Sequence, residues 1–425
     1  MKRRTVWIIL SSVIATLVVV FLALNLSAGE KHIDEKLERL YATDSPQFRR
    51  SMDALLGPPF VEGNRTQVLV NGDEIFPAML EAIRAARHSV TFETYIYWSG
   101  TIGREFAEAL TERARAGVKV HVLLDWIGSV KMEDGFIDEL ERAGVEVERY
   151  HEPHWSNFGR LNNRTHRKLL VVDGTVAFTG GVGIADQWRG NAQDGEHWRD
   201  THFRIEGPVV AQIQAVFMDN WIKSTGNVLH GELYFPALQP RGDQPAQMFS
   251  SSPTGGSESM RLMYLMAITA AKRNIHLSAS YFVPDDLAIR ALAAAARRGV
   301  KVQIILPGKE IDAEIVRRAS RSRWGELLEA GVQIGEYQDT MFHCKVLVVD
   351  ALLVSVGSTN FDNRSLSLND EANLNVLHAG FAARQIEIFE QDLRRTRPVT
   401  LEAWQQRPWQ EKLMEQMASL LGSQL

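Results

Sequence analysis

The sequence has almost no cysteine, no surplus of positive charge and only one long hydrophobic run. Its one cysteine, Cys344, cannot form an intramolecular disulfide, so the fold requires no oxidising compartment. The 47 Lys and Arg residues face 52 Asp and Glu, a formal charge of −5, which disfavours a nucleic-acid partner. With 45% hydrophobic and 23% charged residues among 425, the composition indicates a globular protein of two or three domains. It excludes a disordered chain, a collagen-like fibre and a multi-span transporter.

The one hydrophobic run covers residues 6–26 and contains no charge. It is long enough for a membrane-spanning helix, which needs about 20 apolar residues. A cleaved signal peptide is the alternative, but its apolar region would be shorter, and residues 26–28 match a cleavage site poorly. We therefore expect a membrane anchor over residues 1–27. Basic residues 2–4 precede it, which predicts a single-pass protein of the inner membrane with a cytoplasmic N-terminus and its body on the outer side.

Three sequence blocks occur twice, in the same order. They pair 108–125 with 290–307, 136–150 with 324–337, and 165–181 with 342–358. The first two blocks each have the pattern of a helix, a glycine and a strand rich in Val and Ile. The sequence thus predicts an α/β fold with two tandem domains, each a mixed β-sheet flanked by helices. We place these domains at 58–240 and 241–400, after a juxtamembrane helical stalk at 28–57 and before an amphipathic tail at 401–425.

The third block carries the candidate chemistry. Its two copies supply a candidate catalytic set at identical spacing: His166, Lys168 and Asp173, then His343, Lys345 and Asp350. Side chains alternate along a strand, so each His and Lys share a face that suits a phosphate, while Arg167 and Cys344 face the other way. Each set is also followed at the same spacing by a glycine, Gly180 or Gly357. With this glycine included, independent residue frequencies predict roughly 0.01 such matches, which makes chance untenable. Buried His-Lys pairs without a charged partner would be costly in a core, so a functional site is favoured. For the two aspartates, a structural role at the turn after the strand is the alternative.

These residues resemble the phospholipase D superfamily, which is marked by a duplicated H-x-K-x(4)-D motif with G-S-x-N downstream. The second copy is complete, with Ser358 and Asn360 as candidate phosphate-binding residues. The first copy has Gly181 and Gly183 at those positions, so backbone amides, including that of Gly181, would substitute there. Segments 93–98, 163–168, 197–210 and 280–286 are similar to the cardiolipin synthase branch in particular, and the resemblance covers residues 58–397.

The resemblance implies a covalent phosphohistidine, which we assign to His166, with His343 as general acid and then base. The two lysines would hold the phosphate oxygens. Asp200 and Glu371 lie 34 and 28 residues after the histidines of their own halves, and each is expected to orient that histidine. Ordinary surface charge is the alternative for these two acids. We expect no cofactor and no metal, and we interpret His151 and His154 as loop residues and not as ligands.

The expected function is a membrane-anchored phosphatidyltransferase, a cardiolipin synthase acting on phosphatidylglycerol or another phospholipid. Its partners would be phospholipid substrates and the membrane. The alternatives are a phospholipase D that releases phosphatidic acid, a nuclease, and a non-catalytic lipid-binding scaffold. The charge disfavours the nuclease, and two intact histidines disfavour the scaffold.

Two features of the sequence fit more than one interpretation. The sequence does not indicate an oligomeric state. The arginines at 317, 318, 321 and 323 fit a solvated helix face better than a site for anionic headgroups. The tail at 401–425 fits a helix on the bilayer surface as well as one that closes over the body.

Overall fold

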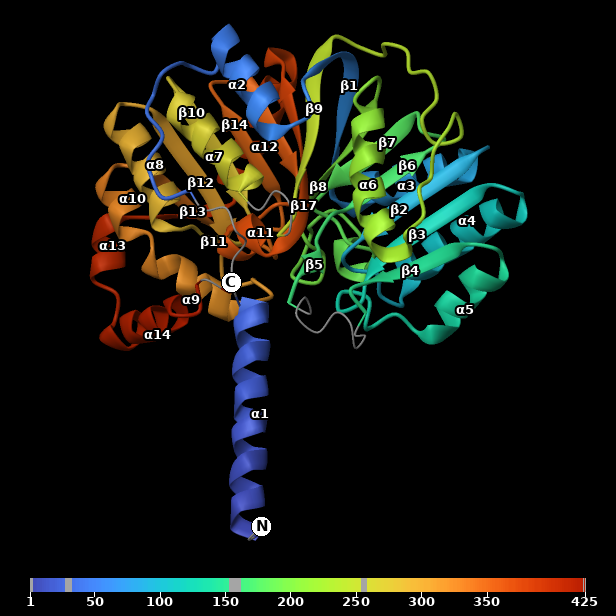
Figure 1. Cartoon of the computed structure of the whole chain (residues 1–425). Coiled ribbons are helices and arrows are strands. Elements are labelled where there is room, and N and C mark those ends of the chain that lie inside the picture. The colour runs from blue at the N-terminus through green and yellow to red at the C-terminus, as the bar shows by residue number, and fades with distance from the viewer. Residues whose placement is uncertain (1–2, 27–32, 153–161, 254–257, 423, 425) are drawn as a thin grey trace.

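The body consists of two similar halves, shown in the computed structural model of Figure 1. The structure describes residues 3–26, 33–152, 162–253, 258–422 and 424. The strands of the first half are β1 (Val61–Val70), β2 (Ser89–Thr94), β3 (Lys119–Asp125), β4 (Glu146–Tyr150), β5 (Arg164–Thr165), β6 (Leu169–Val172), β7 (Val176–Gly180) and β8 (Thr201–Glu206). Its helices are α3 (Asn71–Ala85), α4 (Thr101–Arg115), α5 (Asp134–Arg142), the 3-10 helix η2 (Asp186–Trp188) and α6 (Val210–Thr225).

The second half repeats this order of elements. Its strands are β9 (Gln244–Ser251), β10 (Asn274–Ala279), β11 (Phe282–Val283), β12 (Lys301–Pro307), β13 (Gln333–Tyr337), β14 (Lys345–Val349), β15 (Leu353–Gly357), β16 (Phe361–Asp362), β17 (Asn369–Leu377) and β18 (Thr396–Val399). Its helices are α7 (Ser259–Ala270), α8 (Asp286–Arg297), α9 (Glu314–Ser322), α10 (Gly325–Glu329), α11 (Asn363–Ser367) and α12 (Ala379–Leu393). Helices α13 (Leu401–Gln405) and α14 (Trp409–Ser419) form the tail.

The two halves share one continuous sheet with the order β4-β3-β2-β6-β7-β8-β1-β9-β17-β15-β14-β10-β12-β13-β18, with β5 joined to β17. On either side of the central antiparallel β1–β9 pair the order runs outward in the same way. In each half, three parallel strands (β2, β3, β4 and β10, β12, β13) adjoin an antiparallel set. The predicted fold class, two tandem mixed α/β domains, is therefore confirmed, and an approximate twofold axis passes through the middle of the sheet.

The predicted blocks of helix, glycine and strand are present in both halves. Helices α4 and α8 end just before Gly117 and Gly299, whose positive φ angles of 90° and 92° turn the chain into β3 and β12. Strands β6 and β14 are buried on both faces, as their unbroken apolar sequences predict. In β6, Leu170 packs beneath α3 and α4, whereas Leu169 packs in a cluster that both halves share with α6 and α12. This shared cluster makes the two halves one body.

Helix α1 (Arg3–Leu26) projects away from the body (Figure 1), and its described side chains are exposed. It is the one helix among the described residues with the length and hydropathy needed to cross a bilayer.

The prediction of a helical stalk at 28–57 is wrong for residues 33–45, which are not helical. This segment lies against the second half, where Thr43 donates a hydrogen bond of 2.7 Å to the buried Asp350 carboxylate. Helix α2 (Pro46–Leu56) then packs Phe48 and Met52 into the core with α7. Mixed charge and helix-forming residues predicted a free helix, but burial of these side chains and contacts with the body decide the conformation instead.

Asp173 and Asp350 do not lie with the histidines. Each follows the far end of its strand, about 23 Å along an extended chain from the histidine of its motif. The Asp173 carboxylate accepts hydrogen bonds from the N–H groups of residues 87–89, and the Asp350 carboxylate from those of residues 272–274. The backbones of both aspartates have positive φ. A catalytic role does not fit this position, and the alternative of a structural role at the turn does.

Candidate active site

The backbone of each histidine is hydrogen bonded to the other half of the protein. Strand β5, just before His166, pairs in parallel with β17, and the His166 N–H donates to the Asp370 carbonyl at 2.9 Å. Correspondingly, the His343 N–H donates to the Arg199 carbonyl at 2.8 Å. Asp370 and Arg199 each immediately precede a candidate acid. The backbone of each histidine is thus fixed beside the acid of the other half.

The side chains follow this backbone pairing. His166 Nδ1 lies 2.9 and 3.1 Å from the two carboxylate oxygens of Glu371, and His343 Nδ1 lies 2.7 Å from Asp200 Oδ2. The expectation that each acid serves the histidine of its own half is therefore wrong, because the acid that reaches each ring comes from the other half. A carboxylate at Nδ1 favours the tautomer with its proton on Nδ1, which leaves a lone pair on Nε2.

The two acids are supported by different groups. Ser358 donates its hydroxyl to Glu371 Oε2, and its oxygen accepts the Ala372 N–H at 3.0 Å. Trp188 Nε1 instead donates to Asp200 Oδ2 at 3.0 Å, and the Thr201 N–H donates to the other oxygen at 2.8 Å. Ser358 has no second proton to give, so the prediction that its hydroxyl binds phosphate does not fit this arrangement.

Position 181 requires glycine because the Asp200 carboxylate occupies the space that a side chain would need. A Cβ at position 181 would lie 2.2 Å from Asp200 Oδ1, far inside van der Waals contact. The Gly181 N–H already donates to the Thr201 carbonyl at 3.1 Å. The backbone phosphate contact predicted for Gly181 therefore does not fit either, and the missing side chain makes room for the shorter acid.

The two lysines occupy equivalent positions. Lys168 Nζ donates to the carbonyl of His166 at 2.7 Å, and Lys345 Nζ donates to the carbonyl of His343 at 2.8 Å. Lys345 also donates to Ser280 Oγ at 2.7 Å, and Ser280 in turn donates to Asn360 Oδ1 at 2.6 Å. Asn360 thus lies behind the lysine of its own half and helps to position it.

Burial and positive charge act together on the two imidazoles. Burial, together with the ammonium groups of Lys168 and Lys345, lowers the pKa of His166 to about 4 and that of His343 to about 3, against the opposing effect of the carboxylates. Each lysine acts on the histidine of the other half as well as on its own. The four side chains therefore surround one place, and both imidazoles are neutral at neutral pH in the free protein.

The lysines themselves are easier to deprotonate than usual. Burial lowers the pKa of Lys168 to about 7, with a further contribution from the like charge of Lys345. Burial likewise lowers the pKa of Lys345. Burial raises the pKa of both acids, but the neighbouring histidines and lysines outweigh this effect and hold Asp200 and Glu371 below their usual range. The site thus contains ionised carboxylates that are hydrogen bonded to neutral imidazoles.

Aromatic rings that sequence reasoning missed enclose the histidines. The Tyr95 ring centroid lies 5.1 Å from that of His166, and Tyr281 lies 6.4 Å from His343. Trp188 and Trp198 lie 5.3 and 5.5 Å from His343. The two tyrosines follow β2 and β10 and stand 186 positions apart, an offset within the range of the three repeated blocks. That offset was the available signal.

Other candidate residues lie outside this site. His151 stacks on Tyr150 at the end of β4, and His154 falls outside the described residues. Within the described ranges, no group of three or more His, Cys, Asp or Glu side chains is placed to hold a metal ion.

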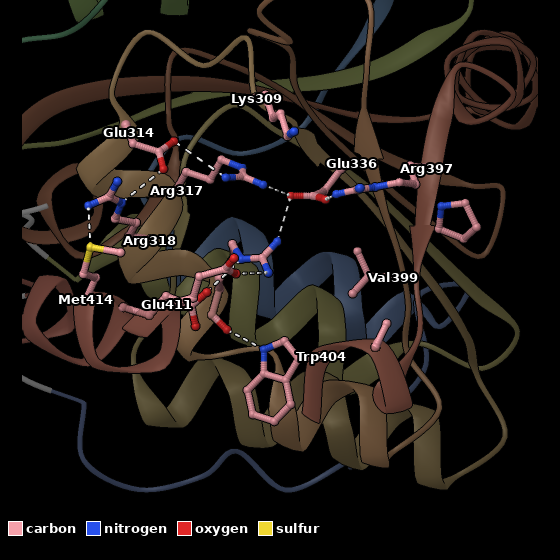
Figure 2. Close-up of a pocket in the computed structure, with 14 residues that line it drawn as sticks. Lys309, Glu314, Arg317, Arg318, Glu336, Arg397, Val399, Trp404, Glu411 and Met414 are labelled. Atoms are coloured by element: carbon pink, nitrogen blue, oxygen red, sulfur yellow. Dashed lines mark hydrogen bonds and ion pairs between the residues drawn. The ribbon is translucent and has the colours of Figure 1, made fainter. Parts of the chain in front are cut away.

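Three arginines of the basic cluster, Arg317, Arg318 and Arg321, line a separate pocket of about 590 Å³ beside α9 and α14 (Figure 2). The side chains of Arg317 and Arg321 are only 12% and 14% exposed, and both form ion pairs with the buried Glu336, at 2.7 and 3.3 Å. A solvated helix face is therefore wrong for these two arginines. Their charge is compensated within the fold.

A doubled α/β body in which each half contributes one His-Lys pair to a single site is the arrangement of phospholipase D-type enzymes. The family model described as the cardiolipin synthase, phospholipase D-like domain matches residues 79–221 and 264–393. These two ranges contain both histidine motifs. The chain belongs to the phospholipase D superfamily and, within it, to the cardiolipin synthase family, whose chemistry is phosphatidyl transfer of the phospholipase D type.

Similar curated proteins agree with this assignment, and a solved structure agrees with the fold. A cardiolipin synthase of Geobacillus thermodenitrificans is 37% identical over 86% of this chain and 73% of its own length. One of Halalkalibacterium halodurans is 34% identical over 92% of this chain and 78% of its own length. The structure of a phosphatidylserine synthase of Haemophilus influenzae covers 89% of this chain and 100% of its own, with a TM-score of 0.65 at 14% identity, which is a likeness of fold.

Replacing Gly181 by alanine tests the fit around Asp200. The new methyl group must displace the carboxylate from His343, so we expect turnover to fall by about 10- to 100-fold, as for other losses of an orienting partner. The matched control is Gly135→Ala, because a Cβ there meets nothing within 4 Å and we expect full activity. Full activity in Gly181→Ala would contradict the tight fit.

The lowered pKa of Lys168 predicts a pH dependence. Its folded-state pKa lies below the ordinary lysine value, so the positive charge is present below about pH 7 and is lost above it. We expect kcat/KM for an anionic lipid to fall above that pH, and Lys168→Arg, which stays charged, to move this limb upward. The measurement is kcat/KM against pH for both proteins, with Lys119→Arg on the exposed start of β3 as control. An identical basic limb in all three would assign it to another group.

Proposed function

We propose that the protein is a cardiolipin synthase that moves a phosphatidyl group from one phosphatidylglycerol to the hydroxyl of another. The observation that carries this proposal is the crosswise site, in which two carboxylate-oriented imidazoles and two ammonium groups from opposite halves act on each other. The cardiolipin synthases that resemble the chain over most of its length support the choice of substrate.

In the first step, His166 Nε2 attacks phosphorus. A P–N bond forms, the bond from phosphorus to the headgroup oxygen breaks, and His343 gives its proton to the departing glycerol. Both lysines donate to the carbonyl of their own histidine, but Lys345 Nζ also lies 3.2 Å from both ring nitrogens of His343. This difference supports His166 as the nucleophile, because an ammonium beside His343 reduces the availability of its lone pair.

His343 must gain a proton before it can act as an acid. Its pKa of about 3 in the free protein reflects burial and two positive charges. A bound phosphodiester anion compensates those charges and raises the pKa, so substrate binding itself prepares the acid. In the second step, His343 takes the proton of the incoming lipid hydroxyl, the P–N bond breaks and a new P–O bond forms.

The low exposure of the site favours a lipid acceptor over water. The side chains of His166 and His343 are 10% and 7% exposed, so few water molecules can reach the phosphohistidine. Hydrolysis to phosphatidic acid is the competing outcome at the same atoms. A net charge of −5 disfavours a nuclease, and the complete site disfavours a non-catalytic scaffold.

We also propose that α1 is a single transmembrane anchor, with its N-terminus in the cytoplasm and the body on the outer side of the inner membrane. The basic residues before the apolar run support this orientation. Protease digestion of spheroplasts, from which the outer membrane has been removed, tests this orientation. A body that is digested only after the spheroplasts are lysed would reverse it.

Trapping the intermediate tests the reaction. We expect acid-quenched protein, supplied with phosphatidylglycerol labelled at phosphorus, to carry the label on His166, and cardiolipin to appear in lipid chromatography. His166→Ala should carry no label. His343→Ala should accumulate label from a substrate with a good leaving group, because the second step then lacks its base. His230→Ala, at an exposed position outside the site, should behave as the unmodified chain.

Label on His343 alone would reverse the two roles. Phosphatidic acid without cardiolipin would reject the synthase in favour of the hydrolase.

A further inference from the structure

Helix α14 presents an apolar face to the outside of the molecule. Trp409, Leu413, Met417 and Leu420 are 69%, 52%, 61% and 78% exposed, and their spacing places them on one side of the helix and its end. A helix on the surface of a globular protein normally turns such a face inward. Contiguous exposed apolar side chains of this kind mark a contact with a partner or a membrane.

The opposite face of α14 fixes the helix in place. Glu415 is buried and accepts from Arg321 Nε at 2.9 Å and from Arg407 Nε at 2.7 Å. Glu411 and Met414, also on this side, line the pocket of Figure 2. Turning the helix over would break both ion pairs and leave the largely buried guanidinium of Arg407 without this carboxylate, which is costly. The outward position of the apolar face is therefore determined by buried ion pairs.

The location of α14 indicates which partner covers it. Figure 1 shows α14 on the side of the body from which α1 projects, running across the direction of α1. Ile33 and Asp34, the first described residues after the anchor, line one pocket with Ser419 and Gly422 at the end of α14. From Leu26 to Ile33 the chain can span at most about 25 Å. The tail therefore lies close to the point where the anchor leaves the bilayer.

The same side of the body carries the active site. Strands β5 and β11 and helix α11 lie there in Figure 1, and His166 directly follows β5. The tail is connected to these elements, since Asn363 Nδ2 of α11 donates to the Gly422 carbonyl at 3.0 Å. A bilayer that receives α14 would lie against the face where lipid substrates must enter.

We propose that α14 is an interfacial helix, whose outer face of Trp409, Leu413, Met417 and Leu420 lies in the bilayer surface and holds the active site against it. The anchor alone fixes one point, whereas a second contact fixes the orientation of the body. Tryptophan suits the headgroup region, and the aliphatic side chains suit the layer beneath it. The assignment goes beyond phosphatidyl transfer and relies on the proposed function only for the lipid substrate.

A fluorescent probe on α14 tests the position of the helix in the full chain. Leu413→Cys and Leu420→Cys are labelled with an environment-sensitive dye in vesicles of phosphatidylglycerol and phosphatidylethanolamine. The control is Leu55→Cys on α2, which is 56% exposed at the opposite end of the body (Figure 1). The native Cys344 is 1% exposed, so the unmodified chain serves as the labelling blank.

We expect the α14 probes to be quenched by nitroxide attached to lipid and protected from aqueous iodide, and the Leu55→Cys probe to show the reverse. Iodide quenching on α14 equal to that at position 55 would overturn the proposal. Protection from both quenchers would overturn it too, because it would indicate a second copy of the chain as the cover.

Activity provides an independent test. In the triple variant Leu413→Glu, Met417→Glu and Leu420→Glu, we expect turnover of vesicle lipid to fall by about tenfold, because three charges oppose insertion. Turnover of short-chain phosphatidylglycerol dispersed as monomers should stay unchanged, and Leu55→Glu should leave both activities unchanged. An equal loss on both substrates, or no loss on vesicles, would overturn the proposal. No transfer by the unmodified chain to any acceptor would reject the proposed function instead, while the probe measurements would still decide the position of α14.

Discussion

Two backbone hydrogen bonds between the halves determine the geometry of the whole site. They join His166 N–H to the Asp370 carbonyl and His343 N–H to the Arg199 carbonyl, so each histidine lies next to the acid that follows. The continuous sheet, the shared apolar cluster and the β5–β17 pairing all keep these contacts in register. Catalytic geometry therefore depends on how the halves dock, and strands that lie far from the phosphate contribute to it.

The two halves contribute the same reacting groups to the site, but different groups donate hydrogen bonds to the two acids. Both halves bring a neutral imidazole, an ammonium and an ionised acid. The supports differ, because a serine hydroxyl holds Glu371, while an indole N–H holds the shorter Asp200 above a glycine. Two imidazoles with different surroundings can take different roles, which a transfer in two steps requires.

The sequence predicted the local features of this structure well. Repeated blocks and identical motif spacing were enough to predict the two α/β halves and the His-Lys pairs, because both follow from short-range periodicity. The pairing of Asp200 with His343 was not predictable in this way, since it depends on contacts between the halves that no local pattern encodes. Ser358 and Gly181 were misassigned for the same reason, because their partners became visible only when the acids were placed in space.

The N-terminal segment and the basic cluster show that composition alone does not predict the conformation or the burial of charged segments. Residues 33–45 look like solvated helix, yet they are not helical, and contacts such as that of Thr43 with Asp350 hold them against the body. Arg317 and Arg321 look like surface charge, yet both pair with the buried Glu336, and Arg321 also pairs with the buried Glu415. The sequence alone does not indicate whether a charged side chain is buried, because its burial depends on the partners with which it forms ion pairs.

The exchange of acids between the halves also means that neither half holds a complete dyad. A half-length chain alone would hold an imidazole without its carboxylate, whereas two such chains together would complete both dyads. Halves that belong to one polypeptide need not be identical, so one acid can be held by a serine and the other by a tryptophan beside a glycine.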